Sequence, residues 1–341
     1  MTTTQLEIGT EGHLGVIALN RPEAINALSL AMIEGIAAQL AAWRDDPTIH
    51  AVLFEGRGSR GFCAGGDVRQ LRELVVAGRL EAGEAYFAAE YDMDGMIATY
   101  PKPVISLTTG IVMGGGLGVA GHAAFRFTTP EASYAMPGAH IGVFCDVGIN
   151  WVLAKAPEAR ALLFLMSGLP VRGADVLALG LADCCIAPDR LAEVRSGIVA
   201  AANTGNVEPA LVALMQAESI QAGERELCAA ADLSAEAFTG ASAAAIVSAC
   251  AAAAGRVPAL APYMAAFGRL SPSSLETIVA QHRAARQMPD VRAVLDLDLR
   301  LAAFTIRQPD FAEGVRAQLV DKDRQPKWSP ATLAAVDRDA I

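Results

Sequence analysis

The sequence predicts an α/β protein with an added helical region toward its C-terminal end. Over roughly the first 200 of 341 residues, short apolar runs alternate with segments of helical periodicity, which is typical of α/β folds. Two glycine-rich turns directly follow predicted strands, and the chain after residue 150 is mostly helical, with many alanines over 228–268. We expect residues 1–205 to form the α/β core and residues 206–341 to form the helical region.

The predicted strands are short apolar runs bounded by turn residues. The run 14–19 (LGVIAL) ends in Asn20-Arg21-Pro22, a turn signal. The run 51–54 (AVLF) is apolar throughout, which suits a strand that is buried on both faces. Three further short runs are predicted to be strands: 104–107, 125–128 and 133–135.

The predicted helices of the first half follow the same alternation. Apolar residues recur at helical spacing from Leu30 to Leu40, after Ser29, a preferred N-cap residue, and this helix is predicted to end near 45–47. Residues 55–67 are predicted to form a loop that leads into a helix beginning at Val68.

The charge balance excludes two classes of partner. The chain has 27 Lys and Arg residues against 37 Asp and Glu residues, a formal net charge of -10. Such an acidic chain is repelled by nucleic acid and by anionic membranes. Because 53% of the residues are apolar and 19% are charged, a disordered chain is also excluded.

Cysteine usage and the lack of a targeting segment indicate the cytoplasm. The six cysteines show neither CxxC nor Cys/His metal spacing, so we expect free thiols in a reducing compartment and no metal site. No signal peptide is visible over residues 1–12. The uncharged stretch 103–125 is long enough to span a membrane, but its six glycines indicate a buried strand, a turn and a helix start. We expect a soluble, cytoplasmic protein.

Two glycine-rich turns are the first candidate site. They are 62–67 (FCAGGD) and 113–116 (MGGG). Glycines between a strand and a helix leave backbone N–H groups free, so two such turns side by side could hold one carbonyl oxygen in an oxyanion hole. Neither turn has the spacing of a dinucleotide or P-loop motif. Close packing of helix on strand is the alternative explanation.

Arginines and isolated acids near these turns are the next candidates. Asp146 is flanked by apolar residues, so a desolvated acid/base group and a helix N-cap are both open. Glu90 lies on a helical segment and is either a functional acid or an exposed surface residue. Four arginines lie near the first glycine-rich turn in the sequence, and they could either bind an anionic ligand or be exposed surface charges. They are Arg57, Arg60, Arg69 and Arg72.

His140 and Cys145 are weaker candidates. His140 is either a general base or a structural histidine, and a buried Cys145 would be an inert core residue. No Gly-x-Ser-x-Gly motif supports a serine hydrolase.

Several segments resemble the crotonase (enoyl-CoA hydratase/isomerase) superfamily. They are NRPEAINAL (20–28), FCAGGD (62–67), KPVI (102–105), MGGG (113–116) and YAMP (134–137). Within that superfamily, three segments are similar to the 3-hydroxyisobutyryl-CoA hydrolases, which act in valine catabolism: 136–148, SPSSLE (271–276) and FAEGVRAQLVDKDRQPKW (311–328).

The resemblance implies a fold, a substrate and site residues. The fold would be a crotonase-like spiral of ββα units with a helical C-terminal region. The thioester carbonyl of an acyl-CoA would be held by the N–H groups of Gly66 and Gly115, and coenzyme A would lie along 24–28 and 64–68. Coenzyme A is then part of the substrate, and no separate cofactor is implied; assembly into a homo-oligomer stays open. The implied substrate-binding residues are Ala24, Ala64, Asp67, Val68 and Gly138.

The chain departs from the family at its acids. Hydratases of this family use two glutamates, and the matching positions here are Gly118 and Gly138. The hydrolases also have glycine at the first position, but they keep the second glutamate together with an aspartate, which is Asp146 here. Glu90 matches a glutamate that contacts the substrate in the hydrolases.

These residues favour hydrolysis of a short-chain acyl-CoA thioester, with Asp146 and Glu90 as the catalytic acids. Activity would be weak or altered because Gly138 replaces the family glutamate, and loss of one general acid/base lowers a rate by about 10²–10⁴-fold. Two alternatives are an enoyl-CoA hydratase/isomerase-type lyase and a non-catalytic acyl-CoA-binding protein. Nothing in the sequence explains why residue 138 is glycine.

Overall fold

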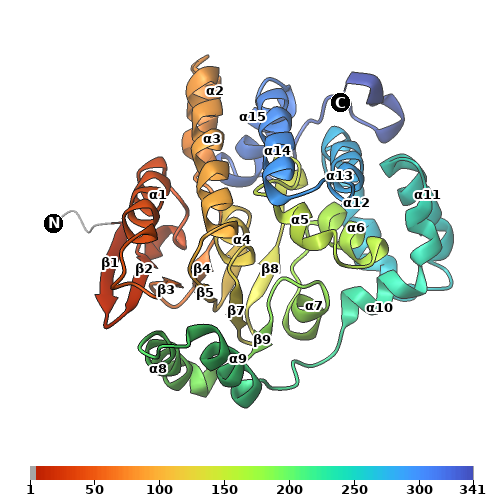
Figure 1. The fold of residues 1–341 in the computed structure, drawn as a ribbon. Helices are drawn as coiled ribbons and strands as arrows, with labels where there is room; N and C mark the ends of the chain where they lie inside the picture. The colour runs from red at the N-terminus through yellow and green to blue at the C-terminus, as the bar shows by residue number, and fades with distance from the viewer. Residues whose placement is uncertain (1–4, 341) are drawn as a thin grey trace. The chain divides into compact units, whose positions relative to one another are not determined.

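The computed structural model describes residues 5–340 (Figure 1). These residues form two compact units. Neither unit is one continuous stretch of chain. The first unit is made of residues up to Gly66, Ala89–Tyr134 and Arg172–Glu224, and the second of Asp67–Ala88, Ala135–Val171 and Arg225 onward. The boundary near residue 205 stays a prediction, since the second unit joins the C-terminal helices to earlier segments.

A six-stranded sheet is the centre of the first unit. Its strand order is β1-β2-β3-β5-β7-β9, with β1 antiparallel to β2 and the other neighbours parallel. The strands are β1 (Leu6–Glu11), β2 (Leu14–Leu19), β3 (Ala51–Gly56), β5 (Val104–Leu107), β7 (Phe125–Thr128) and β9 (Cys184–Cys185).

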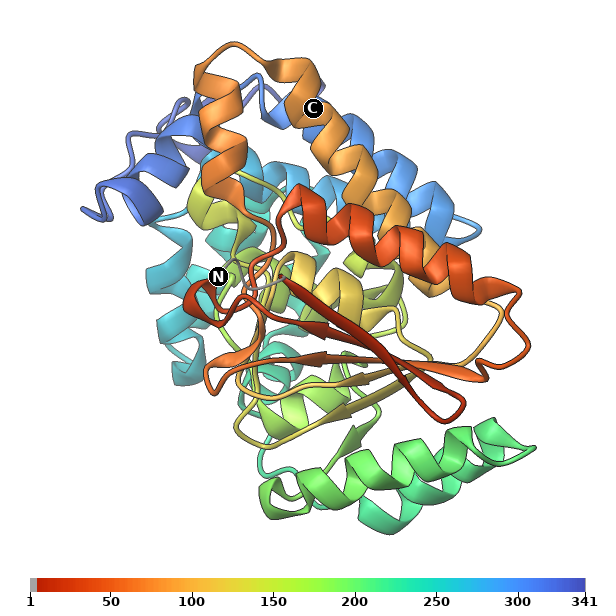
Figure 2. The same ribbon diagram turned by 90° about the vertical axis from the view of Figure 1, so that its left-hand side faces the viewer.

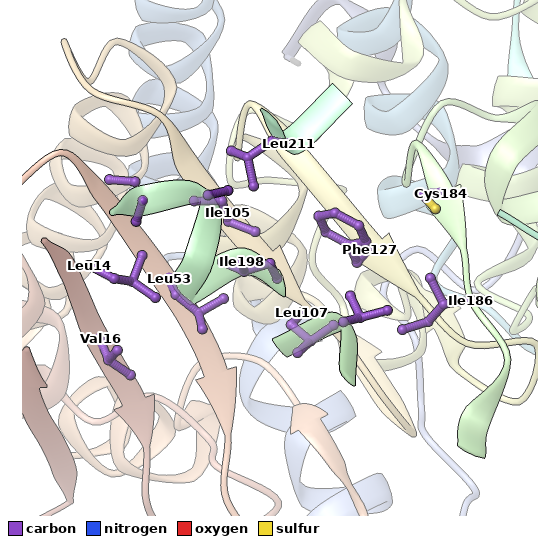
Figure 3. Packing of buried hydrophobic residues seen from close by; sticks show 14 residues of the cluster. Leu14, Val16, Leu53, Ile105, Leu107, Phe127, Cys184, Ile186, Ile198 and Leu211 are labelled. Carbon is purple, nitrogen blue, oxygen red and sulfur yellow. The ribbon is translucent and has the colours of Figure 1, made fainter. Parts of the chain in front are cut away.

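Helices cover both faces of this sheet. Figure 2 shows α1 (Leu30–Arg44) and α4 (Gly115–Gly121) on one face, and α8 (Leu191–Ala202) with α9 (Val207–Glu218) on the other. Side chains of the strands pack against α8 and α9 in a buried apolar cluster (Figure 3), which includes Leu14, Val16, Leu53, Ile105, Leu107, Phe127, Ile198 and Leu211. The α1 helix begins as predicted, because Ser29 Oγ accepts a hydrogen bond from the Met32 N–H at 3.3 Å.

A second, three-stranded sheet positions the two glycine turns. Its order is β4-β6-β8, with β4 (Gly61–Cys63), β6 (Ile111–Met113) and β8 (Ser133–Ala135). Because β4 and β6 are parallel neighbours, the turns that follow them leave from the same edge of the sheet. The parallel strands and the helices between them confirm the predicted α/β fold class.

The predicted strands 14–19, 104–107, 125–128 and 133–135 are confirmed, and 51–54 is extended to Gly56. The prediction of a continuous loop over 55–67 was wrong, because it contains β4. Strands β1, β4, β6 and β9 were not predicted. A three-residue strand containing glycine is too short to show a period-2 pattern, so β4 carried no signal.

The second unit is mostly helical. Its α2 helix begins at Val68 as predicted and is capped by Asp67, whose Oδ1 accepts from the Gln70 N–H at 3.3 Å. The α3 helix (Leu80–Ala98) begins in this unit and ends in the first. The other helices are α2 (Val68–Val76), α5 (Ile149–Leu153), α6 (Glu158–Ser167), α10 (Glu226–Leu233), α11 (Ala243–Ala253), α12 (Ala261–Phe267), α13 (Pro272–Ala285), α14 (Val291–Thr305) and α15 (Pro309–Val315); α7 (Gly173–Ala178) belongs to the first unit.

Two further findings concern partners. Among residues 5–340, no helix combines the length and the apolar character needed to cross a membrane. In the same part of the chain, no group of three or more His, Cys, Asp or Glu side chains could hold a metal ion.

Candidate active site

The two glycine turns lie side by side in the first unit. The Leu28 N–H donates to Gly65 O at 2.8 Å, which fixes the first turn. A Cβ atom built on Gly65 would lie 3.1 Å from Met113 O and 3.4 Å from the Gly115 nitrogen, so the turns are in direct contact. Gly65 has a φ of +107°, a conformation that side-chain-bearing residues rarely adopt. The sequence predicted two neighbouring turns, and the structure places them together.

The N–H groups of Gly66 and Gly115 are two donors at this contact. A Cβ built on Gly115 would be 3.2 Å from the Gly66 nitrogen, which shows how near the two backbones are. Across the described chain, neither N–H donates to a protein acceptor. Two free donors at one point can bind a carbonyl oxygen whose negative charge grows during reaction.

Glu90 reaches these donors from α3. Its side chain is 3% exposed, so the alternative of a surface carboxylate is wrong. A Cβ built on Gly115 would lie only 2.1 Å from Glu90 Oε1. The carboxyl group therefore lies directly over the backbone of the second turn, at a point where any side chain on residue 115 would collide with it.

Asp94 is a site residue that the sequence analysis missed. It lies one helical turn beyond Glu90 and is 0% exposed. A Cβ built on Gly118 would lie 2.6 Å from Asp94 Oδ1 and 2.7 Å from Oδ2. The signal was present in FAAEYDMDGM, where two acids four positions apart occupy the same face of a helix.

Cys63 lies in the same cluster and is not a nucleophile. Burial, together with the charges of Glu90 and Asp94, raises the pKa of its thiol to about 12. Its Sγ contacts Asn26 O at 3.1 Å. A thiol with such a pKa stays protonated near neutral pH and is unreactive.

The segments predicted to bind coenzyme A are joined by a hydrogen bond. The Ala64 N–H donates to Ile25 O at 2.9 Å, which links the stretch that contains Ala24 to the first glycine turn. Arg60 Nη2 donates to Pro22 O at 2.7 Å beside the same stretch. Arg60 is thus bonded to backbone carbonyl oxygens, and its contact with an anionic ligand stays a prediction.

The other three arginines have structural roles. Arg57 is ion-paired with Glu7 at 2.6 Å and with Glu55 at 2.7 Å, so its charge is neutralised by the protein. Arg69 and Arg72 belong to the second unit, where they donate to backbone carbonyls of its C-terminal segment at 2.6 Å and 2.8 Å. The cluster of four arginines in the sequence is therefore not one cluster of free charges.

Asp146 lies in the second unit on a tightly turned loop. It is half-buried, and the two residues after it, Val147 and Gly148, have positive φ angles of 57° and 67°. Gly148 is the N-cap residue of α5, so the N-cap alternative for Asp146 is wrong. Asp67, another predicted site residue of this unit, caps α2 with its side chain, and its N–H donates to Tyr86 Oη at 3.0 Å.

A buried polar network holds this loop on both sides of Asp146. Gln281 Nε2 donates to Cys145 O at 2.8 Å and to Asp298 Oδ1 at 2.6 Å. Asp298 Oδ2 accepts from the Gly148 N–H at 2.8 Å. Burial raises the pKa of Asp298 to about 8. These residues are far apart in sequence, so the sequence analysis could not associate them with Asp146.

The same network continues to a buried histidine. Asn150 Nδ2 donates to Cys145 O at 2.9 Å, and its Oδ1 lies 2.9 Å from His282 Nδ1. Burial lowers the pKa of His282 to about 4, so this imidazole is neutral near pH 7. Burial also raises the pKa of Cys145, which supports an inert thiol, and it lowers the pKa of His140, which leaves both alternatives for that residue open.

The structure supplies the reason for glycine at position 138. A Cβ on Gly138 would lie 2.2 Å from Phe144 O and 3.1 Å from Val143 O. The turn is closed by a hydrogen bond from the Val143 N–H to Gly138 O at 2.9 Å. The backbone that leads to Asp146 therefore folds back over Gly138 and leaves no room for a side chain.

The C-terminal segments that resemble the hydrolases are built around this turn. The Ser271 N–H donates to Ala139 O at 3.0 Å, and Ser271 Oγ lies 2.6 Å from Asp310 Oδ2. A Cβ on Gly142 would lie 2.3 Å from Asp310 O. Ser271 thus bonds to the segment that carries Gly138, and the 311–328 motif packs on it, since a Cβ on Gly314 would lie 2.5 Å from Ile141 C.

The chain matches a known family model over most of its length. The model described as "Enoyl-CoA hydratase/isomerase" matches residues 14–341. The chain is 34% identical over 334 residues to the mitochondrial 3-hydroxyisobutyryl-CoA hydrolase of Gallus gallus, a match that covers 97% of this chain and 86% of that protein. It is 31% identical over 343 residues to the mitochondrial 3-hydroxyisobutyryl-CoA hydrolase of Homo sapiens, with coverage of 97% and 86%.

Two solved structures share the fold. One is named a carnitinyl-CoA dehydratase from Mycobacterium thermoresistibile, with a TM-score of 0.90, 34% identity and coverage of 99% of this chain and 95% of that chain. The other is named an enoyl-CoA hydratase from Rhodobacter sphaeroides, with a TM-score of 0.90, 30% identity and coverage of 99% and 96%. The predicted crotonase-like fold is confirmed. The prediction of a cytoplasmic location is not supported by the relatives named as mitochondrial, and it stays a prediction.

Proposed function

The chain belongs to the enoyl-CoA hydratase/isomerase family, and from this premise we propose that it hydrolyses a short-chain acyl-CoA thioester of the 3-hydroxyisobutyryl-CoA type. Relatives named as 3-hydroxyisobutyryl-CoA hydrolases from birds and mammals support this substrate class, since they match 97% of the chain. The observation that carries the proposal is the pair of free N–H donors at Gly66 and Gly115, with the Glu90 carboxyl group beside them.

We propose a reaction in which this arrangement holds the thioester. The thioester carbonyl oxygen accepts hydrogen bonds from the two N–H groups, which makes the carbonyl carbon more electrophilic. A water oxygen bonds to that carbon, the carbon–sulfur bond breaks, and coenzyme A leaves as the thiol. Removing one donor of such a pair in other enzymes lowers the rate by about 10²–10³-fold, so the donors account for a large part of the expected catalysis.

Coenzyme A is part of the proposed substrate. We propose that coenzyme A lies along residues 24–28 and 64–68, beside Arg60, and that no separate cofactor takes part. The 2.9 Å hydrogen bond from Ala64 to Ile25 supports this placement because it holds the two stretches together.

The roles of Glu90 and Asp146 are part of the proposal. Glu90 is assigned to contact with the bound substrate by its match to the glutamate of the hydrolases, and Asp146 is assigned as the second catalytic residue by its match to their aspartate. Since Gly138 provides no carboxyl group, we propose that turnover is slower than in relatives that have glutamate there, by about 10²–10⁴-fold.

Hydration of an enoyl-CoA is a second candidate function. It is favoured by the carboxyl group of Asp94 at Gly118, the position where the resemblance implies a hydratase glutamate. Two similar solved structures are named as a dehydratase and a hydratase. Against it, no side chain at position 138 supplies a second acid.

The test measures both reactions on the same preparation. Purified protein is mixed with 3-hydroxyisobutyryl-CoA and a panel of short acyl-CoAs, and free thiol is recorded; enoyl absorbance is recorded with crotonyl-CoA. The proposal predicts thiol release that is lost in Glu90→Gln and kept in Glu81→Gln, a matched change at an exposed position of the same helix. Absence of thiol release across the panel contradicts hydrolysis. Calorimetric binding of acyl-CoA without either reaction would identify a binding protein.

A further inference from the structure

Two carboxyl groups on one face of α3 lie against two glycines of α4. Glu90 and Asp94 are four residues apart, so their side chains leave the helix on the same side, one turn apart. Glu90 Oε1 approaches Gly115, and the Asp94 oxygens approach Gly118. The two side chains are 3% and 0% exposed. The helix α4 therefore presents only backbone to two buried acids.

The space beside Gly118 is filled by Asp94. The three atoms nearest to a Cβ built there are Oδ1, Oδ2 and Cγ of Asp94, at 2.6, 2.7 and 2.9 Å. No side chain could leave α4 at this point without displacing that carboxyl group. Because a carboxyl group is costly to bury in an apolar environment, a second buried acid one helical turn from Glu90 indicates a chemical role.

The spacing along α4 suits a water molecule. Residues 115 and 118 are separated by three helical rises of about 1.5 Å each, which gives about 4.5 Å along the axis. A water held by Asp94 would lie about one helical turn along α4 from the Gly115 donor.

We propose that Asp94 is a further catalytic acid of this chain. Its side chain extends from α3 into the space that glycine leaves at position 118, and there it activates the attacking water. The inference rests on the proposed hydrolysis for its substrate. As the water oxygen bonds to the thioester carbon, the Asp94 carboxylate accepts a proton from that water. When the carbon–sulfur bond breaks, the same carboxyl group donates the proton to sulfur. The products are the free acid and the thiol of coenzyme A, and Asp94 is again a carboxylate.

The first experiment replaces the carboxylate with an amide of the same shape. Asp94→Asn is expected to lower kcat for thiol release by about 10²–10⁴-fold, with KM within about threefold of wild type. The matched control is Asp92→Asn, the same change at an exposed position of the same helix, which is expected to leave kcat unchanged. A kcat of Asp94→Asn within about threefold of wild type overturns the inference.

The second experiment separates catalysis from folding. Asp94→Ala removes the carboxyl group, and the double variant Asp94→Ala with Gly118→Asp returns one to the vacated space from α4. The inference predicts that the double variant regains at least about tenfold in kcat over Asp94→Ala. A double variant with the thermal midpoint of wild type and no regain in kcat contradicts it, because a folded site with the carboxyl group returned should then work.

The two proposals can fail separately. Thiol release by wild type that persists in Asp94→Asn overturns the role of Asp94 and leaves the hydrolase function standing. If wild type releases no thiol, the hydrolase function fails, and the same variants are then measured for hydration of crotonyl-CoA. Loss of hydration in Asp94→Asn, with Asp92→Asn unchanged, supports Asp94 as the water-handling acid. A wild type without either reaction overturns both proposals.

Discussion

A side chain at position 138 should destabilise the second unit. A Cβ atom there would lie 2.2 Å from Phe144 O, whereas ordinary contact begins near 3.4 Å, so the overlap is about 1.2 Å. The opposing atom is a backbone carbonyl, and Phe144 itself is 1% exposed, so this segment has little room to move. Inserting one methyl group into a tightly packed site costs about 1–3 kcal/mol, and we expect Gly138→Ala to lower the free energy of unfolding by that amount.

The assay is urea unfolding followed by circular dichroism, with Gly255→Ala as the matched control. Gly255 belongs to the same unit, and a Cβ built on it meets no atom within 4 Å. That substitution should leave stability unchanged or raise it by about 0.4–1 kcal/mol through the unfolded chain. If Gly138→Ala is as stable as Gly255→Ala, the Phe144 carbonyl is not the reason for glycine at 138.

Gly138→Glu extends this prediction to activity. Its carboxyl group cannot reach a working position unless residues 143–144 move, so thiol release should fall or stay unchanged. A large gain in thiol release would mean that this segment moves readily, and it would refute the packing explanation.

Three further predictions concern groups outside the glycine turns. Burial raises the pKa of Asp298 from 3.8 in the unfolded chain to about 8, so its contribution to stability is complete below about pH 4 and is lost as the pH rises through 8. Asp298→Asn should therefore flatten the curve of unfolding free energy against pH in this range. An unchanged slope would count against a buried Asp298 that binds a proton. The six cysteines are buried, so a thiol reagent should label none of them in the native protein and all of them in denaturant. Fast labelling of Cys63 in the native protein would contradict its raised pKa. The Glu55 side chain is 8% exposed and accepts hydrogen bonds from Arg57 at 2.7 Å and from Arg195 at 2.8 Å. Glu55→Gln should therefore lower the free energy of unfolding in urea by about 1–3 kcal/mol. An unchanged free energy would show that the two ion pairs contribute nothing to stability.

Much of the first unit could be predicted from its sequence. The runs 14–19 and 51–54 are apolar throughout because parallel strands covered on both faces bury every side chain, and such runs are visible in a single sequence. The N-cap of α1 was visible for a similar reason, since Ser29 lies next to the helix that it caps. Short strands such as β4 and β6 were missed because three residues cannot show a period.

The chemistry of the site was only partly predictable. The two glycine turns carried a local signal, and their contact follows from the parallel pairing of β4 with β6. The burial of Glu90 and the position of Asp94 depend on how α3 packs against α4, which the spacing of residues along one helix does not reveal. Gln281 and Asp298 bond to the loop that carries Asp146, but they lie more than 130 positions away from it in the sequence. Glycine at 138 likewise has its cause in a carbonyl six residues later, across a turn.

The proposed hydrolysis requires that the N–H groups of Gly66 and Gly115 hold the thioester carbonyl. The most direct measurement is the infrared stretching frequency of an isotope-labelled thioester carbonyl in 3-hydroxyisobutyryl-CoA, recorded free in buffer and bound to the Glu90→Gln variant. Two aligned donors in a water-excluded site polarise the carbonyl more than water does, so the bound carbonyl should absorb at a clearly lower frequency than the free one. A bound carbonyl that absorbs at or above the frequency found in buffer would show that the two N–H groups do not hold it.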